Sequence, residues 1–75
     1  MTENVPNRER NIRRYNAYAQ HREALGFTDY YISKECDIAQ STLSDWKVGR
    51  YCPNADKLLK ICKMVEANLE DILVD

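Results

Sequence analysis

The sequence predicts an all-α fold of five helices joined by short connections. Apolar residues recur at spacings of three and four along successive stretches of the chain, which is the period of an α-helix. Residues with helix-capping side chains stand directly before three of these stretches, at Thr28, Asn54 and Asn68. No strand-like alternation, internal repeat or low-complexity segment is apparent. A chain of 75 residues allows a single domain, which we expect over residues 8–75.

The first expected helix runs from about Arg8 to Leu25, behind a flexible N-terminal arm formed by residues 1–7. The arm is polar and contains Pro6, and chain ends without packing partners are commonly mobile. The apolar stripe of the helix would consist of Ile12, Tyr15, Tyr18 or Ala19, and Leu25. Gly26 suits the C-terminal cap, since glycine adopts the left-handed conformation that helix ends often require.

The stretch from Thr28 to Gly49 predicts two short helices that meet at a tight corner. Thr28 is the expected N-cap of the first, and the second runs from about Gln40 to Val48. Asp37 stands at the turn, where Asp tolerates the left-handed conformation better than most residues. The side chains with inward spacing are Ile32, Ser33, Cys36, Ile38, Leu43 and Trp46. This is the layout of a helix-turn-helix unit, whose second helix can lie in the major groove of DNA.

Two further helices are expected after a short loop. Asn54 caps the fourth, which runs to about Val65 or Glu66 and has the clearest apolar stripe in the chain. That stripe consists of Leu58, Ile61, Cys62 and Val65. Asn68 caps a short fifth helix that ends near Leu73, with Asp71 at the capping-box position.

The charges are nearly balanced but unevenly distributed. The chain has 11 basic and 12 acidic residues and a formal net charge of −1, so the strongly basic composition typical of many nucleic-acid-binding domains is absent. Residues 1–27 nevertheless hold five Arg against three Glu, whereas residues 54–75 hold three Lys against five acids. A basic front and an acidic back suit a molecule with one DNA-facing side.

The composition argues against a metal site, a disulfide framework and an enzyme. Three cysteines at positions 36, 52 and 62, with a single histidine, lack metal-ligand spacing, and the odd number fits reduced thiols in a cytoplasmic protein. No nucleophile elbow, phosphate loop or productive pair of carboxylates is recognisable, so we expect no catalysis and no cofactor. The polar first twenty residues resemble no signal peptide, and no apolar run approaches the roughly 20 residues of a membrane span.

Over roughly residues 10–74, the chain resembles the lambda-repressor/Cro-type helix-turn-helix domains, also called the XRE family. The resemblance is strongest in "STLSDWKVGRYCPNADKLLKICKMVEANLEDIL" and in the segment from Thr28 to Ser33. The chain departs from the family where Asp29 replaces a phosphate-binding Gln and where Ala39 replaces a capping Ser or Thr. Asp37 and one further residue, Glu66, stand where the family usually has Gly.

The resemblance implies a compact five-helix domain that binds double-stranded DNA. The residues expected to contact bases are Gln40, Ser41, Thr42 and Asp45. The residues expected to contact phosphates are Thr28, Lys34, Ser44, Lys47, Arg50 and Tyr51. The arginines of the first helix, Arg8, Arg10, Arg13 and Arg14, could approach the DNA backbone, although a solvated face is the simpler reading.

The resulting hypothesis is a sequence-specific transcriptional regulator that acts as a homodimer on a two-fold operator. The candidate dimer interface consists of Leu69, Ile72, Leu73 and Val74, which could alternatively only close the core. A second hypothesis is a protein–protein interaction module of the same fold with weak or lost DNA binding, because Asp29 and Asp45 would repel phosphates. A third is an antitoxin or accessory subunit that binds DNA only together with a partner.

Overall fold

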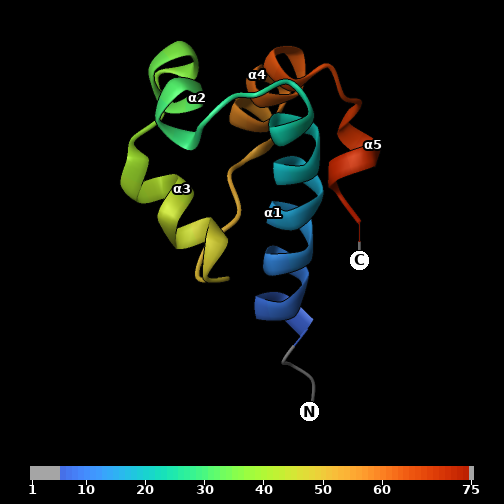
Figure 1. Ribbon diagram of the computed structural model, residues 1–75. Helices are drawn as coiled ribbons and strands as arrows, with labels where there is room; N and C mark the ends of the chain where they lie inside the picture. The colour runs from blue at the N-terminus through green and yellow to red at the C-terminus, as the bar shows by residue number, and fades with distance from the viewer. Residues whose placement is uncertain (1–5, 75) are drawn as a thin grey trace.

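The computed structural model describes residues 6–74, and in this range the chain is helical with no β-strand. Five helices follow one another: α1 (Pro6–Ala24), α2 (Asp29–Cys36), α3 (Gln40–Lys47), α4 (Ala55–Val65) and α5 (Leu69–Ile72). The long helix α1 has α2 and α3 on one side and α5 on the other, with α4 at the end opposite the first turn of α1 (Figure 1). The predicted all-α, five-helix architecture is confirmed.

Helix α1 begins at Pro6, two residues before the predicted start at Arg8. Pro6 and Asn7 therefore belong to the helix and not to the expected arm, whose other residues, 1–5, lie outside the described range. Proline is favourable in the first helical turn, because its missing N–H would have no partner there and its fixed φ suits the helix.

The N-cap side chains of α2 and α4 accept backbone hydrogen bonds, whereas that of α3 does not. The hydroxyl of Thr28 accepts a hydrogen bond from the backbone N–H of Tyr31 at 3.1 Å, and the Asn54 side chain accepts one from Lys57 at 3.0 Å. Ala39 occupies the N-cap position of α3 and makes no side-chain hydrogen bond, as the departure from the family pattern predicts. The helix proposed to enter DNA therefore depends on packing more than on its own cap.

The remaining helix ends also follow the predicted chemistry. The carboxylate of Asp71 accepts a hydrogen bond from the backbone N–H of Asn68 at 3.0 Å, which is the reaching-back half of a capping box. Asp37 ends α2 with a φ of 54°, and Glu66 ends α4 with a φ of 57°. Both residues adopt the left-handed conformation that costs an L-residue with a Cβ roughly 1–2 kcal/mol.

The core is a single cluster to which all five helices contribute. Its largest fully buried side chains are Trp46, Tyr18, Ile32, Leu43, Ile61, Ile72 and Val65. Two cysteines, Cys36 and Cys62, are also buried, and burial raises the pKa of both thiols. Raised thiol pKa values keep these cysteines protonated, so they pack as small apolar residues.

Gly49 brings the corner after α3 against the start of α1. Its φ is +87°, and a Cβ at this position would lie 2.7 Å from Cγ of Arg8 and 2.8 Å from the Arg8 carbonyl oxygen. The Asn11 side chain donates a hydrogen bond to the Gly49 carbonyl oxygen at 3.1 Å. The glycine therefore serves both the turn and the close packing of α1 on the end of α3.

Candidate nucleic-acid interface

Helix α3 has one buried face and one free face. Leu43 and Trp46 are 1% and 0% exposed, and they hold the helix against the core. On the opposite side, the predicted contact residues Gln40, Ser41, Ser44 and Lys47 are exposed, whereas Thr42 and Asp45 are partly exposed. The N-terminal end of α3 thus presents polar side chains to solvent, at the outer edge of the molecule (Figure 1).

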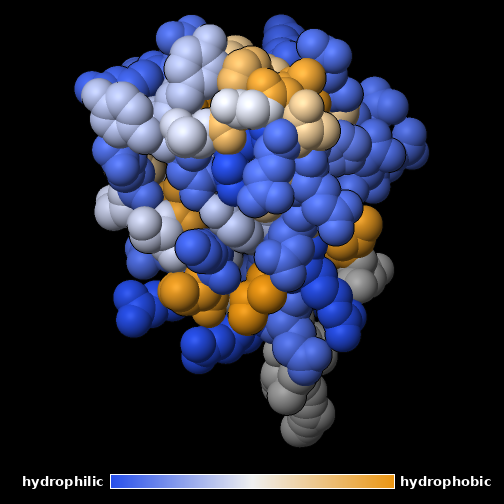
Figure 2. Space-filling model, viewed as in Figure 1, coloured by the Kyte–Doolittle hydropathy of each residue, from blue (hydrophilic) through white to orange (hydrophobic). Residues whose placement is uncertain are grey.

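The predicted phosphate contacts outside α3 are also at the surface. Thr28, Lys34, Arg50 and Tyr51 are all exposed, and they lie on α2 or on the segments that flank α2 and α3. The amine of Lys34 lies 5.4 Å from the ring centroid of Tyr30, one helical turn earlier, so the two side chains form a cation–π interaction. The face of the molecule in Figure 2 is mainly hydrophilic.

Asp45 and Arg50 contact one another within the candidate interface. A guanidinium nitrogen of Arg50 lies 3.5 Å from the Asp45 carboxylate, and the Arg50 side chain is 76% exposed. An ion pair this exposed contributes little to stability, so either side chain can leave it for another partner. A predicted base contact and a predicted phosphate contact are therefore paired with each other in the free protein.

Asp29, which was expected from the family resemblance to replace a phosphate-binding Gln, is held by three side chains of α1. Its carboxylate accepts hydrogen bonds from the Tyr15 hydroxyl at 2.5 Å and the Tyr18 hydroxyl at 2.7 Å. The Nε atom of Arg22 lies 3.0 Å from the same carboxylate. We call these four residues the Asp29 cluster. The charge of the carboxylate is thus balanced by partners within the molecule. Asp29 is therefore not the unpaired acid that was expected to repel phosphates.

The spacing of the three α1 residues in the sequence is a signal for the Asp29 cluster, although apolar periodicity alone does not reveal it. Tyr15, Tyr18 and Arg22 are spaced i, i+3, i+7 and therefore share one face of α1. The two tyrosines were predicted as packing residues, and they are indeed 5% and 0% exposed. Their hydroxyls, however, need acceptors once buried, and Asp29 supplies them.

Burial and charge shift the pKa values within the Asp29 cluster. Burial and the hydrogen bond to Asp29 raise the pKa of the Tyr15 hydroxyl to about 12. The same two causes raise the pKa of Tyr18 well above its usual range. Burial lowers the pKa of Arg22, but the charge of Asp29 raises it, and the net shift is upward. The cluster therefore holds a neutral pair of phenols and one ion pair.

Comparison with protein families decides the class of the molecule. A family model described as helix-turn-helix matches residues 19–72, which is more than half of the chain. The chain belongs to this helix-turn-helix family. The match confirms the resemblance to lambda-repressor-like domains of the XRE type. Comparison with curated proteins and with solved structures finds no significant match.

Membership of the helix-turn-helix family makes DNA binding the general function of the chain, and the family is one of binding domains and not of enzymes. Within residues 6–74, no group of three His, Cys, Asp or Glu side chains is arranged to hold a metal ion. None of the described helices is long and apolar enough to span a membrane.

The candidate dimer residues of this helix-turn-helix domain lie at its C-terminal end. Ile72 is 0% exposed, so it closes the core and cannot offer its side chain to a partner. Leu69 and Leu73 are partly buried, and Val74 is 37% exposed. The Val74 carbonyl accepts a hydrogen bond from Nε of Arg14 at 3.0 Å, which ties this end of the chain to α1.

Proposed function

We propose that the chain is a sequence-specific transcriptional regulator that contacts the major groove with α3 and binds a two-fold operator as a dimer. The observation that carries the proposal is the free polar end of α3 beside the fully buried Trp46. A helix held by its apolar face and presenting Gln and Ser at its N-terminal end fits the docking geometry of helix-turn-helix domains.

Each contact residue has a definite chemical role in the proposal. Gln40 is suited to a bidentate contact with adenine, and the hydroxyls of Ser41 and Thr42 can donate to or accept from base edges. Asp45 can accept from the amino group of cytosine. The phosphate contacts are assigned to Thr28, Lys34, Ser44, Lys47, Arg50 and Tyr51.

The dimer is assigned to the C-terminal end of the chain. A surface hollow of about 540 Å³ is lined there by Asn68, Leu69, Glu70 and Leu73. Leu69, Leu73 and Val74 would supply its apolar contacts, since Ile72 is committed to the core. Two recognition helices would then lie roughly 34 Å apart, about one turn of DNA.

Selection from a random-sequence DNA pool at two salt concentrations tests the proposal. We expect an enriched motif with two-fold symmetry and an affinity that falls as salt rises. Gln40→Ala is expected to weaken binding by about 1–3 kcal/mol and relax the preference at one base pair. Lys47→Ala should weaken binding to all sequences equally and reduce the salt slope by about 1. Lys63→Ala, an exposed change on α4, is the matched control for lost charge.

A second candidate, a protein–protein interaction module of the same fold, is favoured by two observations. Asp45 stands on the proposed groove face, and the chain as a whole carries a formal net charge of −1. No enriched motif and no salt dependence in the selection would support this candidate. Binding that appears only after a partner protein is added would support the third role, an antitoxin or accessory subunit.

A further inference from the structure

The Asp29 cluster has the composition of an anion-binding site. Two phenol hydroxyls and one guanidinium, all from one face of α1, converge on a single carboxylate at the first residue of α2. We infer that Tyr15, Tyr18 and Arg22 form a site for a phosphate-type anion, which the natural chain fills with its own Asp29 side chain. Its extension to DNA rests on the function proposed above.

The donors are fixed in place before any anion binds. Tyr15 and Tyr18 are almost completely buried, and their rings lie against Trp46 with centroids 5.5 Å and 5.0 Å away. The Arg22 side chain is only 13% exposed, and its guanidinium lies 5.6 Å from the centroid of the Tyr18 ring. One of its terminal nitrogens donates to the Phe27 carbonyl at 2.9 Å, so the side chain has little freedom to leave the site.

The carboxylate does not satisfy all the donors around it. Nε of Arg22 is buried and, among the described residues, has no hydrogen-bond partner. It lies 3.0 Å from Asp29, but the contact lacks hydrogen-bond geometry. A phosphate offers more acceptor oxygens in a tetrahedral arrangement, which two carboxylate oxygens in one plane cannot imitate. The site therefore retains a donor that a phosphate could use.

The occupying group is the part of the cluster most open to exchange. The Asp29 side chain is 32% exposed, whereas the donors behind it are buried or nearly so. It directly follows Thr28, the N-cap of α2 and a proposed phosphate contact. A DNA phosphate at the start of α2 would thus compete with Asp29 for these donors, and Asp29 limits the DNA affinity of the natural chain.

The Asp29→Ala variant removes the carboxylate that occupies the site. Binding of inorganic phosphate to this variant then tests the anion site without DNA. Backbone amide shifts around Thr28 and the melting temperature are followed as phosphate replaces chloride at constant ionic strength. We expect phosphate to shift these amides and raise the melting temperature of Asp29→Ala, with little effect on the natural chain. Replacing Tyr15 and Tyr18 by Phe in the Asp29→Ala background should abolish the response.

Glu23→Ala is the matched control. Glu23 also lies near Arg22, at 3.6 Å, but its side chain is 70% exposed and lies outside the cluster of donors. Equal phosphate responses in Glu23→Ala and Asp29→Ala would overturn the inference, because only net charge would then matter. If Asp29→Ala does not fold in chloride, phosphate should restore its helical circular dichroism, and failure to do so overturns the inference as well.

The DNA measurements separate this inference from the proposed function. A several-fold gain in the affinity of Asp29→Ala for the selected DNA motif, beyond that of Glu23→Ala, supports the extension to DNA. A second outcome is that Asp29→Ala binds phosphate but neither it nor the natural chain binds DNA. This outcome supports the anion site and rejects the proposed function. Normal DNA selection with no phosphate response rejects the site alone.

Discussion

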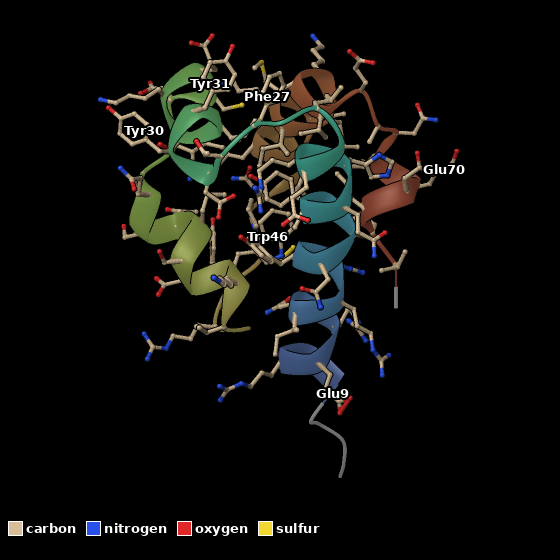
Figure 3. The ribbon with its side chains drawn as sticks, in the orientation of Figure 1. Glu9, Phe27, Tyr30, Tyr31, Trp46 and Glu70 are labelled. Atoms are coloured by element: carbon tan, nitrogen blue, oxygen red, sulfur yellow. The ribbon has the colours of Figure 1, made fainter. Side chains whose placement is uncertain are left out.

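The ring of Tyr18 in α1 stacks on the ring of Trp46 in α3, with centroids 5.0 Å apart and ring planes inclined by 25°. Tyr15 meets both rings edge-on, at 5.4 Å and 5.5 Å. Figure 3 shows Trp46 pointing from α3 toward α1. The outward face of α3 is therefore set by aromatic packing on α1, far away in the sequence.

Replacing Trp46 by Ala is expected to lower the free energy of unfolding by about 3–5 kcal/mol, because the largest core side chain is lost. A loss of this size approaches the whole stability of a small domain, roughly 5 kcal/mol. Trp46→Phe should be much milder, since a ring remains and the buried indole N–H, which has no partner among the described residues, is removed. Urea denaturation followed by circular dichroism measures both variants, and equal losses would contradict this account.

The uncapped start of α3 offers a stabilising substitution. Ala39 has the extended N-cap backbone but no side-chain oxygen, so Ala39→Ser is expected to raise the free energy of unfolding by about 1 kcal/mol. Thr28→Ala, which removes the hydrogen bond to Tyr31, should lower it by a similar amount. Thermal unfolding of the two variants and of the natural chain measures both changes in stability. A destabilised Ala39→Ser would show that the cap position cannot place a hydroxyl correctly.

Asp37 and Glu66, which adopt the left-handed backbone conformation, are expected to give stability gains of different size when replaced by Gly. Glu66→Gly is expected to raise the free energy of unfolding by up to about 1 kcal/mol, because glycine adopts a φ of 57° without strain. Asp37→Gly should give a smaller gain, since Asp tolerates this conformation better than Glu. Chemical denaturation gives both values, and a larger gain for Asp37→Gly would contradict the explanation by backbone strain.

Asp45→Asn is expected to tighten DNA binding several-fold. The change removes a negative charge from the proposed groove face and frees Arg50, whose guanidinium lies 3.5 Å from that carboxylate, for a phosphate. Fluorescence anisotropy with the selected DNA at two salt concentrations measures the effect. Glu66→Gln, an exposed change at the end of α4, is the control for net charge, and an equal gain there would show that the position of the charge does not matter.

The pKa of Tyr15 predicts a loss of stability in alkali. Because folding raises this pKa from 10.0 to about 12, the folded state keeps its proton where the unfolded state loses it. The resulting stabilisation is complete below pH 10 and disappears as the pH rises through about 12. Unfolding by urea between these pH values should show a shallower fall in stability for Tyr15→Phe than for the natural chain. Identical slopes would mean that Tyr15 does not carry the effect.

Much of the fold could be predicted from local pattern. Helix spacing placed Leu43 and Trp46 inside and left the polar end of α3 outside, and the structure confirms both. The caps at Thr28 and Asn54 depend on residues only three positions apart, so sequence alone suffices for them. The predicted start of α1 was wrong by two residues because Pro6 looked like part of an arm, whereas proline also suits a first helical turn.

Local sequence thus determined which stretches become helices, which face of each is apolar, and the helix-turn-helix arrangement of α2 and α3, because these depend on short-range periodicity. The tertiary structure decided what the buried polar groups do. Only the tertiary arrangement brings the side chains of Tyr15, Tyr18 and Arg22 in α1 onto Asp29 at the start of α2, and only the closed core shows that Ile72 lies inside. Those contacts join residues separated by a loop or by most of the chain, and helix periodicity carries no information about how separate helices pack together.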